Sequence, residues 1–384
     1  MEFAAWCYPW DLLDEGVENV ADRLETIGVS EVNLATNYHH VQAFLPHNPK
    51  RRTLFARASS YFQPNDGYGR LTPVPYEGMN GNDWLETIGD AITTTDLTLN
   101  SWTVGCHNSR LGLEYPDATL QTPHGDSLAF GLCPSNPNVQ EYLRSLLADL
   151  DERASFERIE LESFDYFHGR GFGWHHDKFH TDLGHLGEFL FGLCFCDHCQ
   201  AIATSAGVDT EAARETCVAT IDAIAEGTLP ADFDLASWFC AHPNVIKYTA
   251  VRTDTLADLF AEFRAIVDAD LGYYAGLISV ADTWMQGADL SKLSSHLDFI
   301  TITAYESSTT AVLDELRTAR TLSPDAELHV GILPGHPAIH DPKTVAEMVD
   351  VLADEDVPRI SFYNYGLLPE RNLDWVANAT ELYR

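Results

Sequence analysis

Short runs of β-branched and aromatic residues alternate along the chain with segments whose apolar residues recur every three or four positions. This alternation is typical of strand–helix units arranged around a parallel sheet. Eight runs have the length and composition of buried strands: residues 3–8, 31–36, 98–105, 158–163, 272–279, 298–305, 328–333 and 359–365. They predict an α/β fold, a (β/α)8 TIM barrel, and a nine-stranded or open sheet is the alternative.

Three segments carry the clearest helical pattern. Residues 138–150 place leucine and valine side chains at helical spacing, and Pro137 before them is a helix start signal. Residues 255–267 and 344–353 repeat the same spacing of apolar positions. These helices fall between predicted strands, as a barrel requires.

The predicted strands are unevenly spaced. Long insertions occupy about residues 38–95 and 164–250. They follow the second and fourth strands at the C-terminal ends, where barrel enzymes build their active sites. No repeat, low-complexity tract or linker divides the chain, so we expect a single barrel domain over residues 1–384.

The 384-residue chain has 23 Lys and Arg residues against 58 Asp and Glu residues, a formal net charge of −35. Such an acidic excess argues against nucleic acids and anionic membranes as partners, because both attract a basic surface. A carboxylate-rich, lysine-poor surface keeps a protein hydrated in concentrated salt, where the Debye length is about 3 Å. We therefore expect a protein of a halophilic organism; an ordinary acidic protein is the alternative.

The chain opens without a signal-peptide pattern, and no run of about 18 apolar residues predicts a membrane span. Eight cysteines do not form a disulfide scaffold in a chain of this length. Both observations favour the cytoplasm.

A carboxylate ends the fourth predicted strand. Along this strand Arg158, Glu160 and Glu162 share one face, while the residues between them share the other. Acids on an inner face are costly to bury unless they are paired or functional. Glu162 falls at the C-terminal rim and is our catalytic candidate. The alternative is an internal Arg158–Glu160 ion pair with Glu162 as a loop-edge residue.

Glu306 is the candidate for a second catalytic carboxylate. It ends the sixth predicted strand beside Tyr305. Glycoside hydrolysis typically uses two carboxyl groups, about 5 Å apart for retention or roughly 6.5–9.5 Å apart for inversion. Asp165 and Asp282 are weaker alternatives, and Glu306 could instead be an exposed loop acid.

Aromatic and polar side chains gather at the predicted strand ends. Aromatic rings suit sugar faces, which combine C–H patches with hydroxyl groups, although some of these rings will serve only barrel packing. Amides and imidazoles there can hydrogen-bond sugar hydroxyls. The predicted substrate-binding residues are Trp6, Tyr8, Asn37, His39, His107, Asn108, Trp174, Tyr305, Tyr363 and Asn364.

The most specific metal signal is a C-x-C-x2-C cluster, Cys194, Cys196 and Cys199. Structural zinc takes four thiolate or imidazole ligands, so three cysteines need a partner. Cys133 is the first choice, with His198, Cys106 and Cys240 in reserve. Metal-free packing of reduced cysteines is the alternative.

Other cofactor signals are weak. His175, His176 and His180 could approach one another around a catalytic divalent ion, but their spacing is not diagnostic. The glycine-rich residues 169–173 lack the strand–turn–helix context of a dinucleotide site. We expect no organic cofactor.

Residues 132–137 leading into a helix, the strand ending in Glu162, and the C-x-C-x2-C cluster together resemble the barrel domain of family 42 β-galactosidases. The resemblance implies that Glu162 is the acid/base and that such proteins often form trimers. It also implies a structural zinc held by Cys133, Cys194, Cys196 and Cys199.

The chain departs from that family at two points. Leu161 stands where the family has an asparagine before its acid/base. Residues 329–336, at the seventh strand, lack the family's nucleophilic glutamate. If Glu306 replaces that acid, the pair is similar to the α-galactosidase arrangement, in which the strand-four carboxylate is the nucleophile and the two roles reverse.

These patterns predict a glycoside hydrolase that cleaves a small oligosaccharide or glycoside with a carboxylate pair. Two other classes stay open: a divalent-metal-dependent sugar isomerase or lyase on the same barrel, and a non-catalytic carbohydrate-binding barrel. The expected partner is a small carbohydrate, and a homo-oligomer is possible.

Overall fold

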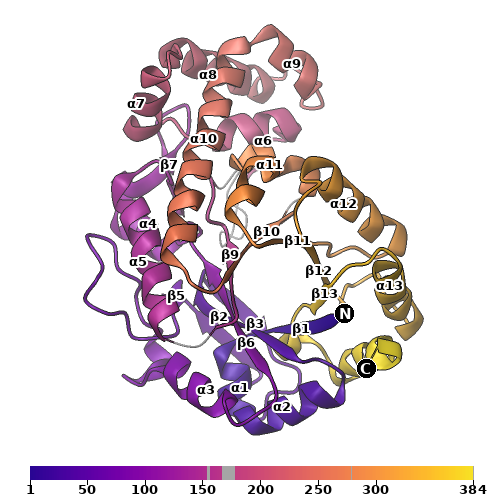
Figure 1. Cartoon of the computed structure of the whole chain (residues 1–384). Coiled ribbons are helices and arrows are strands. Elements are labelled where there is room, and N and C mark those ends of the chain that lie inside the picture. Colours follow the sequence, from indigo (N-terminus) through magenta and orange to yellow (C-terminus); the bar gives the residue numbers. More distant parts are fainter. Residues whose placement is uncertain (154–155, 167–177, 278, 384) are drawn as a thin grey trace.

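The computed structural model describes residues 1–153, 156–166, 178–277 and 279–383. Its centre is a closed barrel in which every neighbouring pair of the eight main strands is parallel (Figure 1). β1 pairs with both β2 and β13, which closes the ring. In ring order the strands are β1 (Glu2–Cys7), β2 (Glu31–Tyr38), β6 (Thr98–Val104), β9 (Arg158–Glu162), β10 (Asp270–Ala275), β11 (Phe299–Thr303), β12 (Leu328–Ile332) and β13 (Arg359–Phe362).

The predicted (β/α)8 barrel is therefore confirmed, and each predicted strand overlaps one strand of the ring. The ninth strand of the sheet, β5 (Ser59–Ser60), is a two-residue antiparallel addition to β2 and does not open the barrel. The barrel strands are buried along almost their whole length because helices cover them outside and side chains fill them inside.

Helices cover the outside of the barrel. Those packed around it include α2 (Val17–Thr26), α3 (Trp84–Ile92), α5 (Pro137–Arg153), α12 (Thr309–Leu322), α13 (Pro342–Asp354) and α14 (Glu370–Thr380). The helix predicted at 255–267 is the second half of a longer helix, α10 (Pro243–Ile266). It begins earlier because Pro243 occupies its first turn, where a missing N–H costs nothing.

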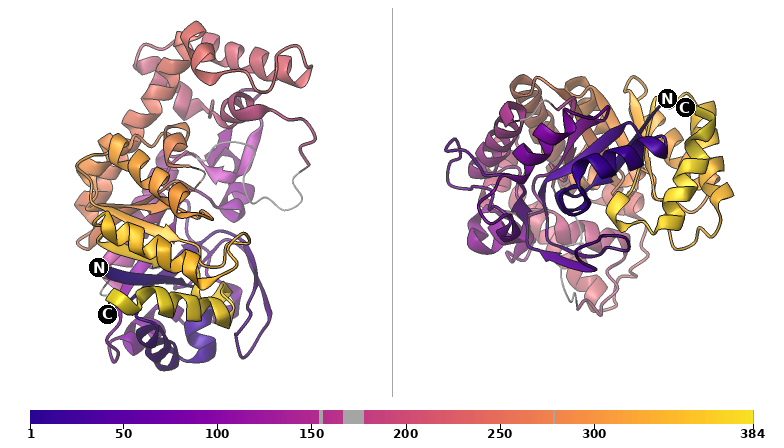
Figure 2. Two further views of the ribbon diagram at one scale, coloured as in Figure 1. Left: turned by 90° about the vertical axis from the view of Figure 1, so that its right-hand side faces the viewer. Right: turned by 90° about the horizontal axis from the view of Figure 1, so that it is seen from below.

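Two segments extend beyond the barrel units. Between β2 and α3 lie a hairpin of β3 (Val41–Phe44) and β4 (Thr53–Ala56), then β5 and the short helix η1 (Glu77–Met79). Between β9 and α10 lie α6 (Gly184–Gly192), α7 (Asp197–Ser205), α8 (Thr210–Ala225) and α9 (Leu235–Ala241), which gather at one end of the molecule (Figures 1 and 2).

A network of charged residues lies at the N-terminal end of the barrel, opposite the rim that carries Glu162. Arg359 is fully buried and lies 2.7 Å from Glu160 and 2.8 Å from Glu31. Arg158 instead pairs with Glu31 at 3.0 Å and with Glu2 at 3.2 Å. The alternative of an Arg158–Glu160 pair is thus wrong. Arg359, on the eighth strand of the ring, neutralises Glu160, so Glu160 is a framework residue.

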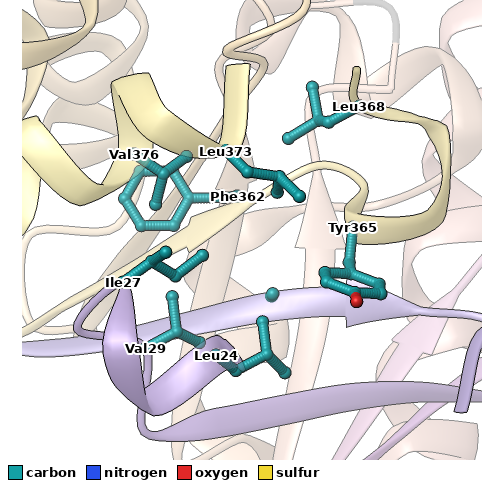
Figure 3. Close-up of a pocket in the computed structure, with 9 residues that line it drawn as sticks. Leu24, Ile27, Val29, Phe362, Tyr365, Leu368, Leu373 and Val376 are labelled. Carbon is teal, nitrogen blue, oxygen red and sulfur yellow. The ribbon is translucent and has the colours of Figure 1, made fainter. Parts of the chain in front are cut away.

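A small void in the outer core lies between β1, β13 and the helices α2 and α14 (Figure 3). It has a volume of about 10 Å³, and its lining is apolar except for Tyr365, whose hydroxyl donates to Glu15. A space of this size without polar partners does not hold a ligand.

Among the described residues, no helix has both the length and the apolar character needed to cross a bilayer.

Candidate active site

Glu162 ends β9 at the C-terminal rim of the barrel, as predicted, and its side chain is only partly exposed. The indole Nε1 of Trp102 donates a 2.6 Å hydrogen bond to Glu162 Oε2. Burial raises the pKa of Glu162 to about 7, the Trp102 hydrogen bond opposes that shift, and the charge of Asp165 adds to it. A carboxyl group whose pKa lies near neutral pH can serve as a general acid.

The chain turns sharply directly after this carboxylate. Ser163 has a φ of 54°, a left-handed conformation that is uncommon for a residue other than glycine. Its carbonyl accepts a 2.7 Å hydrogen bond from the N–H of Cys106, which fixes the turn to the neighbouring strand end. Residues in such conformations concentrate at functional sites.

Aromatic rings from several strands surround Glu162. Tyr38 packs edge-on against Trp102 at 4.6 Å, and Tyr305 lies 5.2 Å from Tyr363. Burial, and then neighbouring charges that include Glu162, raise the pKa values of Tyr38, Tyr305 and Tyr363. These tyrosines therefore stay neutral and lie within electrostatic reach of the carboxylate.

Of the predicted aromatic substrate-binding residues, Tyr305 and Tyr363 are partly exposed. Trp6 and Tyr8 are each 1% exposed. The Trp6 indole donates to the Tyr274 hydroxyl at 2.6 Å, so it closes the floor of the site. Trp174 lies outside the described residues.

The three predicted amide ligands support the framework in this structure. Asn37 donates to the carbonyl of Val104 at 2.6 Å. Asn108 caps α4 (Ser109–Glu114), and Asn364, which follows a cis peptide bond, accepts from the N–H of Gly366. All three are buried. Their contact with a substrate stays a prediction.

Two further carboxylates lie near the rim. Glu306 is partly exposed and directly follows Tyr305, the ring that lies near Glu162. Asp165 is buried and accepts hydrogen bonds from Tyr273 at 2.5 Å and from Gln286 at 3.2 Å. Burial raises the pKa of Asp165 to about 6 although these bonds oppose the shift. The charge of Asp165 thus affects the pKa of Glu162. Glu306 stays the predicted second catalytic carboxylate.

The four predicted cysteine ligands converge. Cys133 Sγ lies 3.8, 3.6 and 3.5 Å from the sulfurs of Cys194, Cys196 and Cys199. A tetrahedral zinc with Zn–S bonds of about 2.3 Å places its sulfurs about 3.8 Å apart. The backbone N–H groups of Gln121 and Cys196 also point at Cys194 Sγ. The geometry and chemistry of this donor set fit a structural zinc ion.

Three histidines form a second cluster at the ends of β2 and β6. His39, His40 and His107 each have a ring nitrogen within 4.8 Å of the others. His39 and His107 are stacked at 4.4 Å with an interplanar angle of 25°. Ligand lone pairs lie in the ring plane, so stacked rings do not aim them at one ion. Burial lowers the pKa of His39 to about 4 and that of His107 well below its usual value, so both are neutral.

The alternative histidine site in the loop after β9 depends on His175 and His176, which lie outside the described residues. Within the described part, His185 lies 3.4 Å from Asp282.

No protein-family model matches the sequence, and no curated protein matches it. Its fold resembles solved glycoside hydrolase barrels. The β-galactosidase from the psychrophilic Marinomonas ef1 superposes with a TM-score of 0.61 at 12% identity over 100% of this chain, which spans 60% of that protein. The glycoside hydrolase domain of PgaB (BpsB) from Bordetella bronchiseptica gives 0.60 at 13% identity, over 100% of this chain and 98% of that one.

A β-galactosidase from Bacillus circulans sp. alkalophilus gives a TM-score of 0.60 at 12% identity and covers 99% of this chain, which spans 55% of it. These neighbours are two β-galactosidases and a glycoside hydrolase domain, and the class that they share with one another is the glycoside hydrolase barrel. At such low identities they establish the fold alone, and they do not distinguish family 42 from other barrels of this class.

Proposed function

We propose that this protein is a glycoside hydrolase in which Glu162 is the general acid. One observation carries the proposal: a carboxyl group at a barrel strand end, with a pKa of about 7, lies among Trp102, Tyr38, Tyr305 and Tyr363. Barrel active sites form at this rim, and sugars bind against aromatic rings. The glycoside hydrolase barrels among the structural neighbours add support.

The proposed reaction begins with Glu162 protonated. Its Oε2 atom accepts the Trp102 hydrogen bond, so the other carboxyl oxygen is the one that delivers the proton to the leaving glycosidic oxygen. A second carboxylate then attacks C1 or activates water. We propose Glu306 for this step because it follows Tyr305, whose ring lies near Glu162.

We also propose that Cys133, Cys194, Cys196 and Cys199 hold a structural zinc ion. Four thiolates leave no open position for water or substrate, so the ion would brace the segment after β9 without taking part in the reaction. Cys133 directly follows β8 (Ser127–Leu132), and Cys196 and Cys199 flank the start of α7. The ion would therefore tie the long insertion to the barrel.

The test is a screen of aryl glycosides in molar KCl, the solvent suited to a chain with a net charge of −35. Wild type and Glu162→Gln are compared on each sugar, with circular dichroism as a check on folding. Turnover of a phenyl glycoside that Glu162→Gln lowers by roughly 10²–10⁴ supports the proposal and identifies the sugar. A folded wild type that hydrolyses no glycoside rejects it.

A further inference from the structure

A hollow of about 560 Å³ opens beside the β3–β4 hairpin, and we call it the Arg57 hollow. Its lining includes His40, Gln42, Phe55, Arg57 and Glu77, from the hairpin, its flanks and η1. In the left view of Figure 2, the segment between β2 and β6 lies on the side opposite the two termini, the side toward which β1 runs. His40 follows the C-terminal end of β2, which is parallel to β6 and β9, so the hollow lies beside the rim that carries Glu162.

The hairpin register shows why an aromatic ring faces this hollow. Gln42 pairs with Phe55, while Ala43 pairs with Leu54 on the opposite face. Ala43 and Leu54 are buried against the protein, so the alternating strand pattern turns Gln42 and Phe55 outward. Phe55 is 67% exposed. Such a ring can pack against a sugar face while the Gln42 amide bonds hydroxyl groups.

The charge in the hollow is opposite to that of the whole protein. Glu77 is neutralised by Arg110, whose guanidinium lies 3.3 Å away. Within the described ranges, Arg57 is the one arginine whose side chain forms no hydrogen bond or ion pair with any other residue; Arg371 bonds only its neighbour Asn372. In a protein with 58 acidic side chains, this leaves an exposed guanidinium available to a ligand.

Ring contacts connect the hollow with the candidate active site. His40 lines the hollow and lies 5.9 Å from His39, which packs on Tyr38 at 4.1 Å. Tyr38 contacts Trp102, the hydrogen-bond donor to Glu162. Tyr38 and Trp102 are buried, so this chain of packed rings fixes the position of the hollow relative to Glu162 along the same rim.

We infer that the Arg57 hollow binds a carboxylate-bearing sugar unit of the substrate, away from the bond that is cleaved. This inference rests on the proposed function and deepens it, because it makes the substrate an acidic oligosaccharide. A guanidinium group can donate two parallel hydrogen bonds to one carboxylate, a bidentate contact that a lysine ammonium group cannot supply. Such direct contact persists in salt that screens longer-range attraction.

The test measures binding without turnover. Trigalacturonate and neutral galactotriose are titrated into the full-length Glu162→Gln protein by calorimetry in molar KCl. We expect trigalacturonate to bind at least about tenfold more tightly, the gain typical of a hydrogen-bonded charged contact. Adding Arg57→Gln should remove that difference.

Arg52→Gln is the matched control, because Arg52 is an exposed arginine of the same hairpin that bonds the carbonyls of Leu45 and Pro46. It should preserve the preference for the acidic sugar. Equal affinity for the two sugars, no measurable binding of trigalacturonate, or equal losses in both arginine variants would overturn the inference. Wild-type turnover of neutral aryl glycosides reports separately on the proposed function.

Discussion

The Trp102 indole and the Glu162 carboxylate form a 2.6 Å hydrogen bond between adjacent strands β6 and β9. This bond stabilises the charged form of Glu162, while burial favours the protonated form more strongly. The balance places the pKa of Glu162 at about 7. A general acid is active below its pKa, so kcat/KM should fall as the pH rises through this value.

Replacing Trp102 with phenylalanine removes the donor and keeps an aromatic ring. The pKa of Glu162 should rise, because the charged carboxylate loses a partner. The alkaline limb of the kcat/KM profile should therefore move to higher pH, with a lower maximum because the carboxyl group is less well oriented. An unchanged alkaline limb would mean that Glu162 does not set it.

Replacing Asp165 with asparagine should shift the same limb in the opposite direction. The charge of Asp165 raises the pKa of Glu162, so its removal lowers that pKa and the activity is lost at lower pH. The amide keeps the shape of the side chain and can still accept from Tyr273. The measurement is the pH profile of kcat/KM beside that of Trp102→Phe, and shifts of the same sign in both would contradict this account.

The cysteine cluster should hold about one zinc ion per chain, measured by metal analysis of the purified protein. Cys133→Ser should lose the metal and lower the thermal unfolding midpoint, since metal affinity contributes to folding free energy. Cys240→Ser is the matched control, because Cys240 is exposed and outside the cluster. Metal content well below one per chain in the wild type would reject the zinc site.

The buried pair of Glu160 and Arg359 offers a stability test. Arg359→Met leaves the Glu160 charge without its main partner and should lower the free energy of unfolding by about 3–5 kcal/mol. Adding Glu160→Gln to that variant should recover part of the loss. Urea unfolding at constant KCl gives both values, and a double variant no more stable than Arg359→Met would contradict a specific pairing.

Much of the fold could be predicted because each barrel strand carries its own signal. A buried parallel strand is a short apolar run with turn residues at its ends, and eight such runs can be recognised without knowing their neighbours. The C-x-C-x2-C spacing predicted a metal-binding cluster. Cys133 lies 61 positions before Cys194, so spacing left it the first choice among several candidates, and the resemblance to family 42 β-galactosidases implied it as the fourth ligand.

The pairings across the barrel could not be predicted. Arg359 is separated from Glu160 by 199 positions in the sequence, and only ring closure decides that it displaces Arg158 as the partner. The β3–β4 hairpin lies within the insertion at about residues 38–95, in which no strand was predicted, so the surroundings of Arg57 could not be predicted. The bond from Trp102 to Glu162 depends on the register of β6 against β9, which a single sequence does not specify.

The most direct test of the central claim compares leaving groups in Glu162→Gln. If Glu162 protonates the glycosidic oxygen, kcat/KM should fall by roughly 10²–10⁴ for a phenyl glycoside, whose leaving group needs a proton. It should fall far less for the 2,4-dinitrophenyl glycoside of the same sugar, whose leaving group departs without one. Equal losses on both substrates, or no loss on either, would contradict the role of Glu162 as the general acid.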